Sequence, residues 1–339
     1  MVSVLGFPIL LAALIAYCVT PLVKRIAFRI GALDMPEARK VHKVPMPRLG
    51  GLGIYVAFLV AVLASMPLTW ELLGVILGGT LIVAVGIADD VWQLPARVKL
   101  LGQVAAALVL VFFDVQVEWI ANPFGEGYIY FDEFSVPLTV FWVVAFTNVV
   151  NLIDGLDGLA AGVGAIASFT VTCLAAQTGY MEPALLSAAL FGSILGFIRY
   201  NFSPATIFMG DTGSMFIGYV IGAFSVDGAV KTAAAVSLLV PAIVMGLPIM
   251  DTAFAILRRY RNGRPIFAPD KGHFHHRLLA LGLNQKQAVL LMYGITAALG
   301  IAAVLFAELR GVWAAVLIAV LATAVAVGAK LIGILDDVR

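Results

Sequence analysis

The stretch N-V-V-N-L-I-D-G-L-D-G-L, residues 148–159, lies between two apolar segments and decides how we expect the chain to fold. Its amides and carboxylates recur every three residues, as Asn148, Asn151, Asp154 and Asp157. Residues three apart share one face of a helix, so these groups can converge on one site. Carboxylates and amides are hard oxygen donors, suited to Mg²⁺ and to the hydroxyls and phosphates of a substrate. The alternative is a capped turn between helices, in which Asp and Asn accept from free backbone N–H groups.

The composition indicates a helical membrane protein. Of the 339 residues, 62% are hydrophobic and 12% are charged, and the mean hydropathy is +1.04. Repeated apolar runs predict an all-α polytopic membrane protein, a bundle of about eleven transmembrane helices. We expect residues 1–339 to form a single integral membrane domain whose first span is retained and not removed as a signal. The expected spans are 3–21, 49–66, 71–88, 99–113, 135–150, 159–177, 183–198, 214–226, 232–256, 287–306 and 312–332.

The basic residues predict the orientation. With the N-terminus outside, all but two of the 21 lysines and arginines, Lys231 and Arg310, fall on the inner side. This positive-inside bias places the C-terminus in the cytoplasm. Every sizeable polar cluster falls on the same inner side, so we expect a cleft that opens to the cytoplasm. Pro241 and Pro248 predict a break in the ninth span, and the outer loop 114–134 predicts a small hairpin.

Two charged clusters adjoin the first four spans. In the first inner loop, K-V-P-M-P-R-L-G-G, the cations Lys43 and Arg48 are suited to binding phosphate, although simple retention of basic residues on the inner side is the alternative. Asp89 and Asp90 stand together at the end of the third span, and Lys99 begins the fourth. Adjacent carboxylates at a membrane boundary repel each other unless a cation offsets them, so we expect a Mg²⁺-phosphate site here. A salt-bridged helix end is the alternative.

Two later clusters complete the inner side. Asp211 stands between glycines in F-M-G-D-T-G-S, just before the eighth span, where a carboxylate can reach a metal or can simply cap the helix. The loop P-D-K-G-H-F-H-H-R-L-L holds His273, His275, His276 and Arg277. It has no Cys, and the carboxylates elsewhere favour a harder ion than zinc. Imidazoles and a guanidinium suit pyrophosphate or sugar, whereas the alternative is a solvated basic loop.

These groups on one membrane face are those needed for Mg²⁺-assisted phosphoryl transfer from a charged, water-soluble donor to a lipid. An ion-coupled transporter is a second hypothesis, because intramembrane carboxylates mark ion pathways, but transport sites tend to lie near the midplane within inverted repeats and we find no repeat. An intramembrane aspartyl protease is a third. It needs two aspartates that share a proton, and the abundance of basic groups in the inner loops argues against it.

The motifs D-D, N-x-x-N-x-x-D-G-x-D-G-L, F-M-G-D-T-G-S and H-F-H-H-R, in this order, resemble those of the MraY/WecA/TagO family of polyprenyl-phosphate N-acetylhexosamine-1-phosphate transferases. The resemblance covers nearly the whole chain and implies ten or eleven helices, a cytoplasmic cleft and a broken helix near the His loop. That loop is similar to the WecA/TagO branch, which transfers N-acetylglucosamine-1-phosphate from UDP-N-acetylglucosamine to undecaprenyl or another polyprenyl phosphate, releases UMP and so initiates envelope glycan synthesis. A phospho-N-acetylmuramoyl-pentapeptide transferase, as in the MraY branch, is the alternative.

By motif, the resemblance implies roles for individual residues. Asp211 matches the magnesium ligand, and Asp89, which we expect as a second ligand, matches the carboxylate that activates the lipid phosphate. Asp90 and Lys99 complete the expected catalytic set. The expected substrate-binding residues are Lys43, Arg48, Asn148, Asn151, Asp154, Asp157, His273, His275, His276 and Arg277. The implied cofactor is Mg²⁺, with Mn²⁺ as a substitute, and the implied partners are the two substrates, membrane lipid and a second copy of the chain in a bacterial inner membrane; nucleic acid is not an expected partner.

Overall fold

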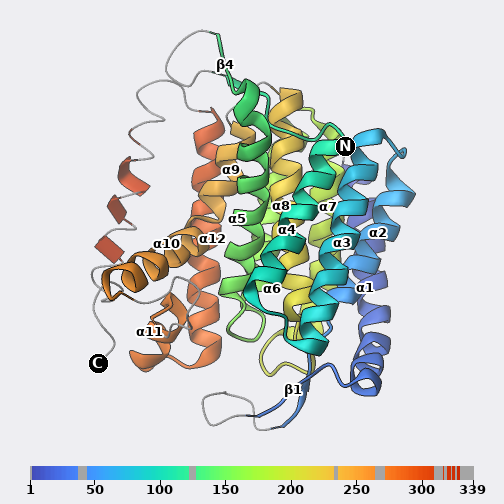
Figure 1. Cartoon of the computed structure of the whole chain (residues 1–339), viewed down its shortest axis with the longest axis vertical. Coiled ribbons are helices and arrows are strands. Elements are labelled where there is room, and N and C mark those ends of the chain that lie inside the picture. Colours follow the sequence, from blue (N-terminus) through green and yellow to red (C-terminus); the bar gives the residue numbers. More distant parts are fainter. Residues whose placement is uncertain are drawn as a thin grey trace.

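The computed structural model describes residues 2–36, 44–121, 127–232, 236–263 and 272–308, together with 316, 319–321, 323–324 and 327–328. Helices make up nearly all of this part of the chain (Figure 1). They are α1 (Val2–Ile30), α2 (Gly51–Ser65), α3 (Trp70–Trp92), α4 (Ala96–Phe112), α5 (Ser135–Ile153), α6 (Leu159–Gln177), α7 (Met181–Asn201), α8 (Gly210–Thr232), α9 (Val236–Val244), α10 (Gly246–Arg261), α11 (Phe274–Ala280) and α12 (Gln285–Glu308). A 3₁₀ helix, η1, covers Asp132–Phe134.

Six helices in the described ranges are long and apolar enough to cross a membrane, and the bent pair α9–α10 makes a seventh if it is one span. The chain is therefore an all-helical polytopic membrane protein, but the eleven expected spans are not confirmed. α2 has 15 residues and α4 has 17, fewer than the roughly 20 that cross a hydrocarbon core. The expected span 312–332 lies largely outside the described residues.

Helix ends follow local sequence signals. The Thr69 hydroxyl accepts from the Leu72 N–H at 3.1 Å and caps the start of α3. α3 ends where Gln93 adopts a left-handed conformation, and Pro95 immediately precedes α4. The break expected from Pro241 and Pro248 is confirmed, because α9 and α10 meet at an angle of 74° around residue 245.

Four short strands form two antiparallel pairs. β1 (Leu33–Asp34) pairs with β2 (Met46–Pro47), at the end of the bundle where α1 finishes. β3 (Trp119–Ala121) pairs with β4 (Tyr128–Tyr130) at the opposite end, which confirms the hairpin expected in the loop 114–134. Both pairs lie outside the helical bundle.

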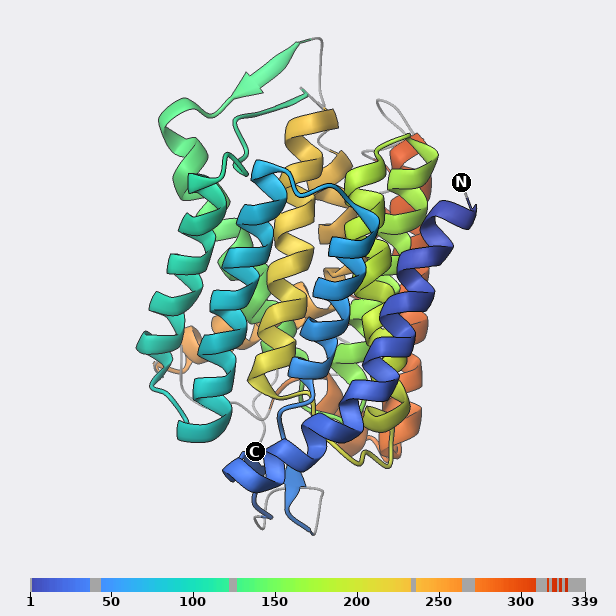
Figure 2. The same ribbon diagram turned by 90° about the vertical axis from the view of Figure 1, so that its right-hand side faces the viewer.

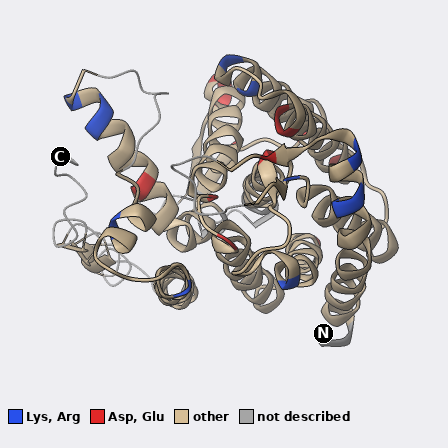
Figure 3. Cartoon of the chain, turned by 90° about the horizontal axis from the view of Figure 1, so that it is seen from below, with Lys and Arg blue, Asp and Glu red and all other residues tan. Residues whose placement is uncertain are grey.

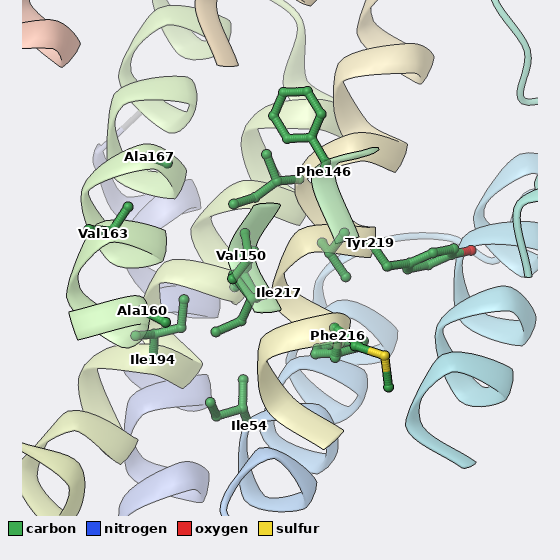
Figure 4. Packing of buried hydrophobic residues seen from close by; sticks show 14 of the residues in the cluster. Ile54, Phe146, Val150, Ala160, Val163, Ala167, Ile194, Phe216, Ile217 and Tyr219 are labelled. Carbon is green, nitrogen blue, oxygen red and sulfur yellow. The ribbon is translucent and has the colours of Figure 1, made fainter. Parts of the chain in front are cut away.

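α8 lies in the middle of the bundle and packs against α2, α3, α5, α6, α7 and α9 (Figure 2). Its side chains Phe216, Ile217 and Tyr219 are fully or almost fully buried and face residues of neighbouring helices, among them Phe146 and Val150 of α5 (Figure 4). Because a central helix is fixed from several sides, the position of its first turn is set by the whole bundle. Asp211 lies in that first turn.

Candidate active site

The aspartates at the end of α3 meet the first turn of α8, although 121 positions separate Asp90 from Asp211 in sequence. Asp90 Oδ1 accepts from the Asp211 N–H at 3.0 Å, and Oδ2 accepts from the Thr212 N–H at 3.1 Å and from the Thr212 hydroxyl at 2.7 Å. Backbone N–H groups in the first turn of a helix have no partner within the helix. Asp90 therefore caps α8 from a different helix and fixes the position of Asp211.

Two cations lie among these carboxylates. Lys99 Nζ of α4 donates to Asp211 Oδ2 at 2.8 Å and to Asp89 Oδ2 at 3.3 Å. Arg48, which precedes α2, contacts Asp90 Oδ1 through Nε and Nη2, each at 3.2 Å, and its Nη2 lies 3.9 Å from Asp211 Oδ1. Burial alone would lower the pKa of the Arg48 guanidinium, but the surrounding carboxylates outweigh this effect and raise it. The site thus groups two cations with three carboxylates at one end of the bundle. Figure 3 shows the chain from below, with its basic and acidic residues coloured.

A glycine makes the approach of α3 to α8 close. Gly86 lies one turn before Asp90, and a Cβ added at this position would overlap the backbone of Thr212. A larger residue would hold the two helices apart and would separate Asp90 from the N–H groups that it caps. Gly86 therefore contributes to the site although its own chemistry is inert.

The motif at 148–159 forms the end of α5 and the loop before α6, as expected for a turn between helices. Asn151 Nδ2 donates to the Ser214 hydroxyl of α8 at 2.9 Å, and Asn148 exchanges hydrogen bonds with the Gln103 amide of α4, with Asn148 Nδ2 2.6 Å from Gln103 Oε1. Burial and the negative charges of Asp211 and Asp90 raise the pKa of Asp154 to about 8. Asn148, Asn151 and Asp154 therefore face the cluster around α8.

Asp157 has a different position from the other three polar residues of the motif. Its Oδ2 accepts from the Ala205 N–H at 3.0 Å, in the loop that joins α7 to α8. That loop leads directly to Asp211. The structure thus assigns the Asp157 carboxylate a partner in the protein, which favours a role in holding the α7–α8 loop.

The His loop meets the same motif from the other side. His273 and His275 are buried, and the His275 ring lies so close to the loop before α6 that a Cβ on Gly155 would be 2.5 Å from Nε2. Neither ring nitrogen of His275 has a hydrogen-bond partner among the described residues. Burial, followed by the neighbouring imidazole of His276, lowers the pKa of His275 to about 3, so the ring is neutral at physiological pH. The His276 side chain is exposed, and that of Arg277 is half-buried.

Asp251 of α10 is a residue that the sequence did not single out. It is 4% exposed, its Oδ2 lies 3.0 Å from His273 Nδ1, and its Oδ1 accepts from the Phe274 N–H at 2.8 Å. Asp251 therefore fixes both the imidazole and the first residue of α11. The sequence signal for Asp251 was a lone carboxylate in an amphipathic segment. The signal for Gln103, which is buried in α4, was a polar residue between apolar neighbours.

Of the expected site residues, the structure brings together Arg48, Asp89, Asp90, Lys99, Asn151, Asp154 and Asp211. It places Asn148 one contact away, through Gln103, and places His273, His275, His276 and Arg277 on or beside α11. Lys43 lies outside the described residues, as does the first part of the His loop.

The donor chemistry of the cluster fits Mg²⁺. Within the described ranges, no group of three or more His, Cys, Asp or Glu side chains is arranged to hold a metal ion. Mg²⁺ is usually held by one or two carboxylates together with water and substrate phosphates, and not by a full set of protein ligands. Asp89 and Asp211, whose carboxylates share the Lys99 ammonium, supply such a pair.

Comparisons with known proteins identify the family of the chain. The family described as "Glycosyl transferase family 4" matches residues 72–229. The chain is 46% identical over 276 residues to the "Probable undecaprenyl-phosphate N-acetylglucosaminyl 1-phosphate transferase" of Bacillus subtilis (strain 168), covering 81% of this chain and 77% of that protein. It is 42% identical over 315 residues to the "Decaprenyl-phosphate N-acetylglucosaminephosphotransferase" of Mycolicibacterium smegmatis, covering 84% and 77%.

A more distant relative extends the same relationship. The chain is 26% identical over 275 residues to the "Undecaprenyl-phosphate alpha-N-acetylglucosaminyl 1-phosphate transferase" of Escherichia coli (strain K12), covering 79% of this chain and 75% of that protein. The first two relatives exceed 40% identity over more than three quarters of each protein. The chain therefore belongs to glycosyl transferase family 4, the MraY/WecA/TagO family that its motifs resemble.

Proposed function

We propose that this protein transfers N-acetylglucosamine-1-phosphate from UDP-N-acetylglucosamine to a polyprenyl phosphate and releases UMP. The observation that carries the proposal is the contact of Lys99 with both Asp89 and Asp211, which joins three helices at one end of an apolar bundle. Such a cluster suits a pyrophosphate and a lipid phosphate that meet at the membrane surface. The names of the relatives, which specify N-acetylglucosamine and prenyl phosphates for those proteins, support the same substrates here.

In the proposed reaction, an oxygen of the polyprenyl phosphate attacks the β-phosphorus of the nucleotide sugar. The bond between the β-phosphorus and the bridging oxygen breaks, and UMP leaves with that oxygen. Lys99 and Arg48 donate to phosphoryl oxygens, where negative charge accumulates. The second pKa of a phosphate monoester is near 6, so most of the acceptor is ionised at neutral pH and Asp89 acts chiefly by orienting it.

Asp90 has a positioning role in this proposal. Its two oxygens already accept from Asp211, Thr212 and Arg48, and it is 3% exposed. A carboxylate whose acceptor positions are occupied by the protein has none left for a substrate hydroxyl or a metal. Asp90 therefore holds Asp211 and Arg48 in place, and Asp251 does the same for His273.

Mg²⁺ is the proposed cofactor, with Mn²⁺ as a substitute. Asp211 and Asp89 would hold it, and when bound it supplies positive charge that offsets the charge of the pyrophosphate. Asn151, Asp154 and the side chains of α11 line the proposed site for the uridine and the sugar. Lys43, outside the described residues, stays a predicted phosphate ligand.

We propose that the site faces the cytoplasm and that the N-terminus lies outside. The positive-inside bias of the sequence supports this orientation, since Arg48 and Lys99 belong to the segments that hold all but two of the lysines and arginines. The single membrane domain over residues 1–339 and the homodimer that the resemblance implies stay predictions; chemical cross-linking of native membranes tests the dimer.

The test uses the full-length protein, purified in detergent, with undecaprenyl phosphate and Mg²⁺. With UDP-N-acetylglucosamine we expect UMP and a sugar-linked lipid pyrophosphate in equal amounts, and with UDP-N-acetylmuramoyl-pentapeptide we expect neither. Asp211→Asn should lower turnover by roughly a hundredfold or more. The matched control is Asp114→Asn, an exposed aspartate at the opposite end of the bundle. Product from the pentapeptide donor alone would overturn the choice of sugar, and no UMP from either donor would overturn the proposed activity.

A further inference from the structure

A pocket of about 380 Å³ lies between α1 and α7, beside the loop that leads to α8. Lys24, Arg199 and Thr206 line it, together with Tyr17, Thr20, Pro21 and Tyr200. The candidate active-site residues of the described ranges are not among the lining residues, although Ala205, next to Thr206, contacts Asp157. The pocket is thus a separate feature at the active-site end of the bundle.

A proline in α1 accounts for the shape of the pocket. Pro21 has no N–H, so the Tyr17 carbonyl lacks its usual helical donor. The Tyr200 hydroxyl of α7 donates to this carbonyl at 3.1 Å, and the two tyrosine rings lie 5.5 Å apart. One wall of the pocket is therefore built and hydrogen-bonded before any ligand binds.

Lys24 and Arg199, the two cations of the pocket, have no ion-pair partner among the described residues. Within the described part of the chain, neither Lys24 nor Arg199 lies within salt-bridge distance of a carboxylate, and no Asp or Glu lines the pocket. The Thr20 hydroxyl donates to the Ala16 carbonyl and the Thr206 hydroxyl to the Tyr200 carbonyl. Among the described residues that line the pocket, the charged donors are consequently the Lys24 ammonium and the Arg199 guanidinium, a combination suited to a phosphate.

An apolar surface continues from the pocket along α1. Phe7, Leu10, Leu14 and Tyr17 are each at least 51% exposed and recur at helical spacing. From Tyr17 to Phe7 the helix rises about 15 Å, which is half of the roughly 30 Å hydrocarbon core. A soluble phosphate would leave this surface unused, whereas the acyl chains of a lipid in one leaflet would lie along it.

We propose that the pocket binds the phosphodiester headgroup of an anionic phospholipid, with Lys24 and Arg199 on the phosphate and the acyl chains along α1. The proposal rests on the membrane location of the chain and on the pocket, and it is independent of the transferase activity. It makes the protein selective for an anionic over a zwitterionic lipid at one defined position.

The test is native mass spectrometry of the full-length protein in detergent, titrated with phosphatidylglycerol or with phosphatidylcholine of the same acyl chains. A cation at the membrane surface contributes enough to change affinity about fivefold. Lys24→Gln and Arg199→Gln should each weaken phosphatidylglycerol binding by about that factor, and the double variant by about 25-fold. Phosphatidylcholine has the same phosphodiester, but its own quaternary ammonium offsets the charge, so its binding should weaken less than that of phosphatidylglycerol.

Arg25→Gln is the matched control, because Arg25 is the next residue of α1, is exposed and does not line the pocket. It should bind phosphatidylglycerol as wild type does. Unchanged binding by the double variant, or an equal loss in Arg25→Gln, would overturn the proposal. Displacement of phosphatidylglycerol by glycerol phosphate would also overturn the proposal, because it indicates a site for a soluble anion. Displacement by equimolar undecaprenyl phosphate would overturn it as well, because it indicates a substrate site. Melting temperatures without lipid establish that the variants are folded; if the double variant melts early, the two single variants decide.

Discussion

Asp89 and Asp90 are neighbours in sequence with different surroundings. Replacement by Asn should therefore lower mainly the stability of the protein at Asp90 and mainly its turnover at Asp89. Asp90→Asn replaces one carboxylate oxygen with an amide that donates and cannot accept. Asp90 Oδ1 accepts from Arg48 and from the Asp211 N–H. Asp90 Oδ2 accepts from the N–H and the hydroxyl of Thr212. Whichever oxygen is replaced, a backbone N–H of α8 loses its acceptor and the pairing with the Arg48 charge weakens.

The magnitude follows from these contacts. A hydrogen bond to a charged group contributes about 1.5–3 kcal/mol, and removing one partner of a buried ion pair costs about 3–5 kcal/mol. The Thr212 hydroxyl can rotate to accept from the new amide, and Arg48 is 20% exposed and partly hydrated. We therefore expect Asp90→Asn to lower the free energy of unfolding by about 2–4 kcal/mol.

Asp89→Asn should cost far less stability. The Asn oxygen still accepts from the Leu94 N–H, which Asp89 Oδ1 contacts at 2.8 Å. Only the 3.3 Å pairing with Lys99 is lost, and Lys99 is 25% exposed, so the expected cost is about 1 kcal/mol or less. Because Asp89 orients the acceptor phosphate in the proposed mechanism, turnover should fall by roughly a hundredfold or more.

Both effects are measurable on the same purified samples. Thermal unfolding in one detergent, followed by tryptophan fluorescence, reports stability, and UMP release at saturating Mg²⁺ reports turnover. Glu133→Gln, in the exposed 3₁₀ helix at the opposite end, should change neither quantity. If Asp90→Asn melts with wild type, or if Asp89→Asn is the less stable variant, the assignment of Asp90 to positioning and Asp89 to chemistry is refuted.

Three further predictions concern the His loop. Asp251→Asn should lower kcat/KM about tenfold and cost about 1 kcal/mol of stability. The Asn oxygen can still accept from the Phe274 N–H, but the hydrogen bond between residue 251 and His273 is reversed in direction. A kcat/KM equal to that of wild type in the UMP assay would contradict this. Gly155→Ala should displace the His275 ring and reduce activity, whereas Gly294→Ala, where a Cβ meets nothing within 4 Å, should not; UMP release compares the two. The pKa of His275 is about 3 in the folded state and 6.5 in the unfolded state. Between these two pH values the unfolded chain binds more protons than the folded one, so the stability falls as the pH falls from 6.5 to 4.5. His275→Gln should remove about 2–3 kcal/mol of that pH dependence, measured as melting temperature against pH, and an unchanged slope would show that the ring is accessible.

Much of the site could be predicted because its polar residues stand out against an apolar chain. Asn148–Asp157 at a turn between helices, Asp211 at the start of a helix and the break near Pro241 and Pro248 are all where the sequence placed them. Charged groups at a membrane boundary are costly unless they are paired, so their presence indicates a site. The convergence of segments more than 100 residues apart followed from their common side of the membrane.

Pairing partners and span number could not be obtained in this way. The contacts of Asp90 with Thr212 and of Asp251 with His273 depend on helix rotation and on close approach at Gly86, which hydropathy does not encode. The eleven expected spans assumed that every apolar run crosses the bilayer. α2 and α4 are too short for that assumption, and α1 extends beyond its apolar part through Lys24 to Ile30.

The link between Asp90 and α8 has a consequence for how the protein is made. The ribosome finishes α3 about 120 residues before it delivers the N–H groups that receive Asp90. Arg48 is synthesised earlier still and can accompany the carboxylate during that interval. The Asp90 carboxylate therefore meets its α8 partners only after α8 has been made, and a nascent chain that stops after α7 carries Asp89 and Asp90 without the helix that supplies Asp211.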